Sequence, residues 1–221
     1  MARMTDNSKG PVARRAMLAG IAAGAALFGF GASKAEAQAP APPQGFQPAR
    51  HAKDDWFDEV PGRHRFFLDT VSAAGAGEAI LFAKNFFKAN KSGYDLEPSD
   101  LAVVICLRHH ATPLAFNDTI WAKYGPAFAE AIKLDTGGKI PLANPHAAGF
   151  ADLVSRGVHF AICDMATHHF AEVVAGKTNP TPEAVYEEMV GAAHPRAHFA
   201  PAGIVAVNRA QERGYTFAYV G

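Results

Sequence analysis

A continuous aliphatic segment, residues 101–107 (LAVVICL), is the feature that most constrains the fold of this chain. A strand without polar residues is buried on both faces, and such strands are typical of parallel sheets covered by helices on both sides. Other segments with strand-like apolar patterns lie at 64–71, 158–163, 198–199 and 215–220. The chain therefore predicts a sheet that is covered on both faces.

Helical patterns separate these strand-like segments. Ala79, Phe82, Ala83, Phe86 and Phe87 recur with the i, i+3, i+4, i+7, i+8 spacing of an amphipathic helix. Strands that alternate with helices form βα units with parallel strands. We therefore expect an α/β fold, a three-layer α/β/α domain with a mostly parallel sheet of about five strands. The other predicted helices follow Asn117 or Asp118, span 150–156, follow Thr167, follow Thr181-Pro182 and span 201–213.

Residues 1–37 have the order of an export signal. A basic start with Arg14-Arg15 leads into an Ala/Gly-rich apolar run at 19–32, and Ala35-Glu36-Ala37 offers a small-x-small cleavage site. The apolar run is shorter than the roughly 20 residues that a membrane span needs. Paired arginines before a weakly apolar core resemble a twin-arginine (Tat) signal. We therefore expect export to the periplasm and no membrane span after cleavage.

The mature chain divides into a linker and a domain. Residues 38–62 contain five prolines and predict an extended arm, in which Trp56-Phe57 is a candidate anchor to the domain or to a partner. Residues 63–221 form the predicted compact domain. The whole chain has 21 basic and 21 acidic residues, and cleavage removes more basic than acidic ones. A mildly acidic mature chain excludes a nucleic-acid binder, because nothing supplies the basic surface that phosphates require.

Histidines gather where the predicted strands end. The chain has ten histidines but only two cysteines, which excludes a disulfide scaffold and a four-cysteine zinc site. In parallel sheets the binding crevice lies beyond the carboxyl ends of the strands. The candidate binding residues at two such ends are Arg108, His109, His110, Thr112 and His169, beside the candidate catalytic residues Cys163 and His168.

The two cysteines have different expected roles. Cys163 ends its strand four residues before Thr167, the expected cap of the next helix. A helix N-terminus with nearby histidines favours the thiolate form of cysteine, although a buried structural cysteine is the alternative. Cys106 lies inside the aliphatic segment and is expected to belong to the core. A disulfide between the two stays open, because it depends on whether their strands are neighbours.

Several segments together resemble the DsrE/DsrF-like sulfur-relay family. They are the glycine–strand–cysteine segment at 157–163 (GVHFAIC), the closing helix and strand that contain 201–205 and 211–215, and the opening helix at 75–90. The resemblance covers residues 63–221 and implies a compact α/β/α domain that commonly forms homo-oligomers. It also implies that the strand-end cysteine, here Cys163, accepts sulfane sulfur as a persulfide. Sulfur-relay members are cytoplasmic, so the export signal indicates an exported branch.

The first functional hypothesis is therefore sulfur relay, with a small sulfur species or a partner protein as donor. Cys163 is the nucleophile or sulfur carrier, and His168 stabilises its thiolate. Arg108 and His109 receive an anionic sulfur compound. This role requires no cofactor and describes a carrier or binding protein rather than a stand-alone enzyme.

Two alternatives use the same residues differently. Imidazole rings suit copper, zinc and haem iron, so one histidine of each pair, with His146 and Cys163, is a candidate metal or haem site. The chain is otherwise a non-catalytic interaction subunit, whose histidines are surface or packing residues and whose proline-rich arm docks on a neighbour. The sequence leaves the cofactor unknown.

Overall fold

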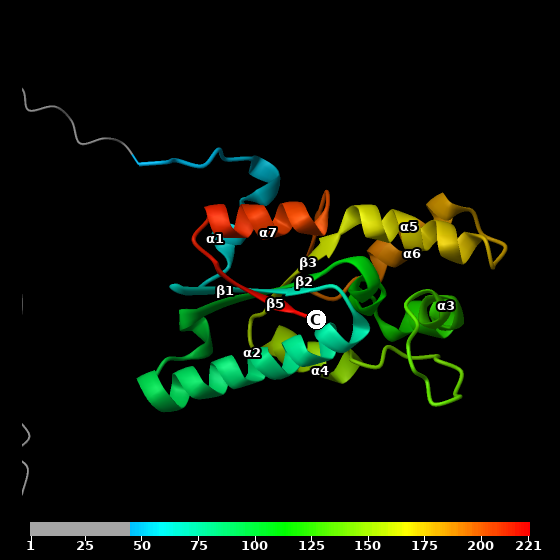
Figure 1. Cartoon of the computed structure of the whole chain (residues 1–221), viewed down its shortest axis with the longest axis horizontal. Coiled ribbons are helices and arrows are strands. Elements are labelled where there is room, and N and C mark those ends of the chain that lie inside the picture. The colour runs from blue at the N-terminus through cyan, green and yellow to red at the C-terminus, as the bar shows by residue number, and fades with distance from the viewer. Residues whose placement is uncertain (1–44) are drawn as a thin grey trace, which may run out of the picture. The chain divides into compact units, whose positions relative to one another are not determined.

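The computed structural model describes residues 45–221, and the predicted export signal lies outside them. Five parallel strands form one sheet in the order β4-β3-β2-β1-β5. Their order in the chain, alternating with helices, gives the expected three-layer α/β/α architecture (Figure 1). The bounds are β1 (His64–Thr70), β2 (Leu101–Leu107), β3 (His159–Cys163), β4 (Ala197–Ala200) and β5 (Thr216–Val220).

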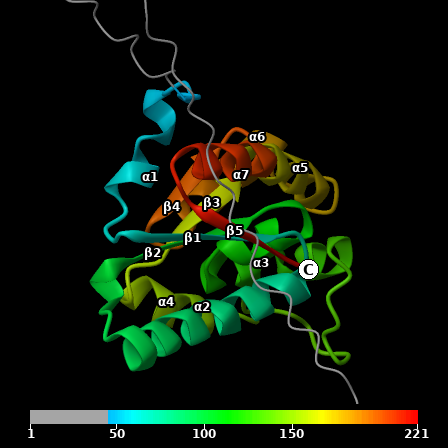
Figure 2. The same ribbon diagram turned by 60° about the vertical axis from the view of Figure 1, so that its left-hand side comes forward.

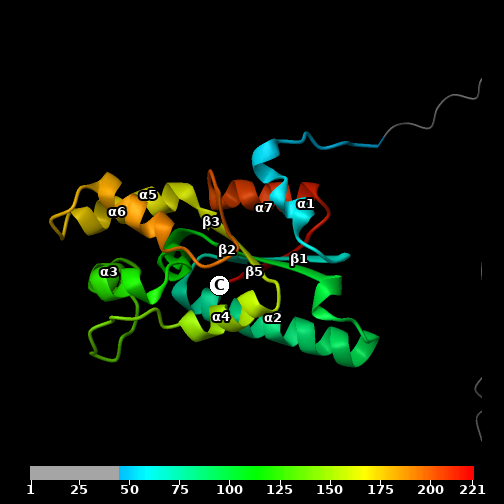
Figure 3. The ribbon, with the colours of Figure 1, turned by 180° about the vertical axis from the view of Figure 1, so that it is seen from behind.

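The helices form a layer on each face of the sheet and a group at one edge. Helices α2 (Ala73–Tyr94) and α4 (Ala147–Ser155) cover one face, and α1 (Trp56–Glu59) and α7 (Gly203–Glu212) cover the other (Figure 2). Helices α3 (Asp118–Ala131), α5 (Asp164–Ala175) and α6 (Pro182–Gly191) lie toward the carboxyl ends of the strands (Figure 3). Three short 3-10 helices complete the described part: η1 (Ala52–Asp54), η2 (Pro98–Asp100) and η3 (His109–Ala115).

Strand β2 is buried on both faces, as its sequence predicts. Val103, Ile105 and Leu107 belong to the core beneath α2 and α4, whereas Val104 and Cys106 belong to the core beneath α7. All seven residues of the strand are buried. The aliphatic segment therefore separates two cores and leaves the chain no surface in mid-sheet on which to place polar chemistry.

The proline-rich arm contributes to one of these cores. Phe57 and Val60 are buried beneath α7, and the Tyr215 hydroxyl donates to the Phe57 carbonyl at 2.7 Å. Trp56 stacks on Phe57 and on His198, with ring centroids 3.7 and 4.0 Å apart. The compact unit consequently begins at Phe46, upstream of the expected boundary at residue 63.

The crevice between β1 and β5 is filled by the chain itself. In this strand order the direction of winding reverses there, which is where many open α/β sheets bind ligands. The Ser72 hydroxyl accepts the Gly75 N–H at 2.9 Å and donates to the Gly221 carbonyl at 3.0 Å. A side chain at Gly75 would collide with the Val220 carbonyl. Backbone packing this close leaves the ends of β2 and β3 as the next positions for a site.

Candidate functional site at the carboxyl ends of the strands

Cys163 is both the last residue of β3 and the N-cap of α5. Its backbone is extended, and its Sγ accepts the Ala166 N–H at 3.4 Å. The first turn of a helix has backbone N–H groups without intrahelical partners and a positive electrostatic potential. Both effects favour a negative charge on the Cys163 sulfur.

The expected cap Thr167 is wrong, and the reason is local. Helix α5 begins at Asp164, so Thr167 lies inside it, fully buried, and its hydroxyl donates to the Cys163 carbonyl at 3.0 Å. Cysteine is an uncommon N-cap, whereas threonine is a frequent one. The helix therefore starts earlier than predicted, which moves Cys163 into the cap position and His168 beyond the first turn.

Arg108 forms a two-pronged ion pair with Asp69. Its Nε and Nη2 donate to the two carboxylate oxygens at 2.7 and 2.8 Å, and Asp69 is almost completely buried. The carboxylate holds the pKa of Arg108 above its ordinary value. The aliphatic part of Arg108 lies against Gly203 at the start of α7, where a side chain would collide with it. Arg108 therefore fixes the end of β2 to β1 and α7, and its charge is already matched.

Cys106 lies close to this ion pair and has no access to solvent. Burial and the neighbouring Asp69 carboxylate raise the pKa of the Cys106 thiol well above its usual value. Its register partner in β3 is Ala161, two residues before Cys163. This diagonal offset separates the two Cα atoms by about 8 Å, beyond the reach of a disulfide. Both cysteines are accordingly free.

The histidine pair after β2 faces α5 rather than Cys163. His109 has a left-handed backbone with φ 52°, and its ring stacks on His110 with centroids 4.1 Å apart. Burial and the positive charges of His109, Lys133 and His169 lower the pKa of His110. The structure thus brings His110 near His169. Neighbouring Thr112 is buried, and its hydroxyl donates to the Leu107 carbonyl at 3.4 Å, so it serves the fold.

His168 turns toward α6. Its ring stacks on Tyr186 with centroids 3.9 Å apart, and its Nε2 lies 3.8 Å from the Asp164 carboxylate. The Tyr186 hydroxyl donates to Asp164 at 2.8 Å, and burial together with that hydrogen bond raises the pKa of Tyr186 to about 12. Tyr186 and Asp164 escaped the sequence reasoning. Asp164 directly follows Cys163, and its acidic side chain in the first helical turn was the available signal.

A further histidine pair lies at the opposite ends of β3 and β4. His159 Nδ1 and His198 Nε2 are 3.0 Å apart, and Arg196 Nη1 is 3.4 Å from His159 Nε2. Burial, His198 and Arg196 lower the pKa of His159 to about 4. These rings pack under Trp56 and take no part in the carboxyl-end site.

Within residues 45–221 no three histidine, cysteine, aspartate or glutamate side chains are grouped so that they could hold a metal ion. The histidines singled out by the sequence therefore separate into the His109–His110–His169 neighbourhood and the His168–Tyr186 stack. In the same part of the chain, no helix is long and apolar enough to cross a membrane.

Comparison with known proteins gives one structural likeness. No family model matches the chain, and neither does any curated protein. A solved structure of a protein of unknown function, MTH1491 from Methanobacterium thermoautotrophicum, is similar with a TM-score of 0.41 and 11% sequence identity. The alignment covers 71% of this chain and 99% of that one.

Proposed function

We propose that this protein is an exported carrier of sulfane sulfur, which it holds as a persulfide on Cys163. The observation that carries the proposal is the placement of the Cys163 sulfur as the N-cap of α5, at the carboxyl end of β3. A thiol at a helix N-terminus is stabilised as the thiolate, which is the nucleophilic form.

The transfer step conserves atoms and electrons. The Cys163 thiolate attacks the outer sulfur of a persulfide donor, a new S–S bond forms, and the S–S bond of the donor breaks. The electron pair leaves on the donor's inner sulfur as a thiolate, so no external oxidant or reductant is needed. The reverse reaction with an acceptor thiolate unloads the carrier.

The surroundings of Cys163 support a helix-based activation of the thiol. The charge of Arg108 is matched by Asp69, and His168 stacks on Tyr186. The stabilisation of the thiolate consequently falls to the backbone N–H groups of α5. Cys163 exposes 8% of its surface, whereas Cys106 exposes none, so only Cys163 is open to a donor.

Persulfide loading tests the proposal directly. The chain from residue 38 onward is treated with glutathione persulfide and its intact mass is measured. We expect one added sulfur atom in the wild type and none after Cys163→Ser, which keeps an N-cap side chain at that position. Cys106→Ala is the matched control and should load like the wild type. Equal loading of the Cys163→Ser protein would refute the proposal.

A further inference from the structure

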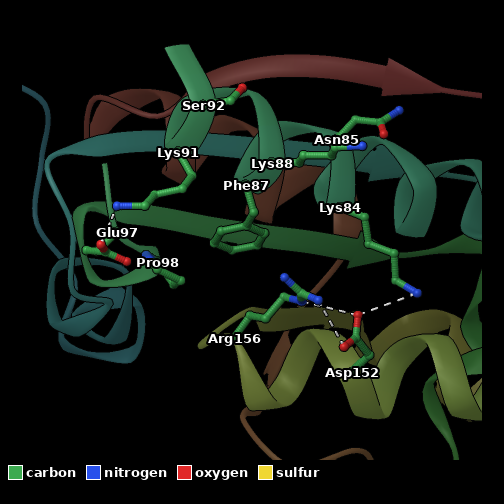
Figure 4. Close-up of a pocket in the computed structure, with 10 residues that line it drawn as sticks. All are labelled: Lys84, Asn85, Phe87, Lys88, Lys91, Ser92, Glu97, Pro98, Asp152 and Arg156. Atoms are coloured by element: carbon green, nitrogen blue, oxygen red, sulfur yellow. Dashed lines mark hydrogen bonds and ion pairs between the residues drawn. The ribbon is translucent and has the colours of Figure 1, made fainter. Parts of the chain in front are cut away.

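A second concave region lies between α2 and α4, on the sheet face opposite to α7. It is a groove of about 750 Å³ whose floor is the ring of Phe87 (Figure 4). The groove lies at the ends of α2 and α4 that precede β2 and β3, and therefore at the opposite edge of the sheet from Cys163. It belongs neither to the cysteine site nor to the histidine clusters.

Close helix packing at one end creates the groove at the other. At Gly149 a side chain would collide with Ile80, and at Gly77 a side chain would press on the His146 ring. These two glycines therefore let α2 and α4 approach each other closely. Farther along α2 the residues that face α4 are long and charged, so the helices are no longer in direct backbone contact and Phe87 is left at the base of an open channel.

The walls of the groove are predominantly cationic. Four cationic side chains line it, Lys84, Lys88, Lys91 and Arg156, against two carboxylates. Lys84 and Arg156 share Asp152 at 3.4 and 3.2 Å, and Lys91 bonds Glu97 at 2.6 Å. Among residues 45–221 no carboxylate lies within ion-pairing distance of Lys88. The central cation of the groove is thus the one without an anionic partner.

We propose that this groove binds a small organic anion with a phosphate-type dianionic head and an apolar body. Lys88, between Lys84 and Lys91 on one face of α2, supplies the charge that the head requires, since lysine binds phosphate as a compact point charge. The single contact of Lys84 with Asp152 is long enough to be exchanged for the ligand, while Arg156 keeps Asp152 in place through two bonds. The apolar body lies along the floor above Phe87, and the volume suits a ligand of this size.

Phenyl phosphate is the probe, and amide NMR spectra of the chain from residue 38 onward provide the readout. We expect saturable shifts confined to residues 84–98 and 152–156. Inorganic phosphate should bind about ten-fold more weakly because it lacks an apolar body. Shifts scattered over other lysines, equal affinity for inorganic phosphate, or absence of saturation would overturn the proposal.

Charge variants separate the groove from general electrostatics. Lys88→Glu should weaken phenyl phosphate binding by at least about ten-fold, and Lys88→Gln by a smaller factor, because a charged hydrogen bond is lost. Lys139→Glu makes the same change of net charge on a distant exposed loop and should alter the affinity less than about two-fold, because exposed charges farther apart than the Debye length are largely screened. If Lys139→Glu weakens binding as much as Lys88→Glu, the groove is not the site. The spectra of the variants also show that each remains folded.

Discussion

The carboxyl ends of β2 and β3 lie side by side in the sheet, each with a cysteine, yet their chemistry is opposite. At the end of β2, Asp69 and Arg108 neutralise each other and Cys106 is completely buried. At the end of β3, Cys163 begins a helix and is partly open. Reactivity in this sheet therefore depends on the structure at the strand's carboxyl end, a helix N-terminus or an internal ion pair, and not on the cysteine itself.

The largest expected effect comes from breaking the ion pair at β2. Asp69→Ala leaves the Arg108 charge without its partner in a largely buried place, so we expect a loss of about 3 kcal/mol in the free energy of unfolding. Denaturant unfolding measures it. Asp152→Ala removes an exposed ion pair and serves as control, with an expected loss below about 1 kcal/mol. A similar small loss for both variants would show that the end of β2 is not held by its charges.

The difference between the cysteines is tested by alkylation. Iodoacetamide should modify Cys163 at least about 100-fold faster than Cys106, because reaction of the buried thiol requires the structure to open. Peptide mapping by mass spectrometry assigns the modified residue over time. Cys106→Ala should leave the fast phase intact and Cys163→Ser should abolish it. Comparable rates at the two positions would show that the two strand ends do not differ in reactivity.

A third test separates the carboxyl end of β3 from its amino end. His159 has a pKa lowered from 6.5 to about 4, so the unfolded chain takes up the proton first as the solution is acidified. The stabilisation is present above pH 6.5 and is lost as the pH falls toward 4. Full expression of the shift would be about 3 kcal/mol, and screening of this half-exposed ring reduces it to about 1 kcal/mol.

Thermal unfolding between pH 7 and about 4 measures this dependence. His159→Gln should flatten the curve, while His64→Asn, at an exposed ring, should follow the wild type. Persulfide loading of His159→Gln at neutral pH should be unchanged. A loading defect there would mean that the two ends of β3 are coupled.

The smallest effect is expected at His168. Its exposed ring stacks on Tyr186, so His168→Ala should cost no more than about 1 kcal/mol of stability. The rate of persulfide loading should change less than about three-fold if the backbone of α5 stabilises the thiolate. Stopped-flow loading kinetics decide the matter, and a ten-fold loss would return His168 to the role that the sequence suggested.

The sequence predicted the architecture well because periodicity reports burial. The aliphatic segment 101–107 became β2 with the expected bounds, and Asn117 caps α3 as expected. The start of α5 was misplaced, because threonine is the commoner cap and nothing in the local pattern marks Cys163 as one.

The candidate site was harder to predict than the fold. Adjacency in sequence suggested that Arg108, His109 and His168 share one crevice, but side-chain direction depends on helix phase. Arg108 turned inward to Asp69, a residue of β1 that no local pattern connects to it. Likewise, the stack of His168 on Tyr186 depends on how α5 packs on α6. Such pairings between distant segments cannot be read from one sequence.

The position of β5 beside β1 has a consequence for how the molecule is made. The Thr216 hydroxyl donates to the Arg65 carbonyl across 151 positions of sequence, so the first strand waits for the last. During synthesis β1 to β4 are available early, while the outer edge of β1 stays unpaired. Contacts this remote slow folding, and an open strand edge invites association with other chains. The interval before β5 emerges is therefore when this protein is most in need of a chaperone.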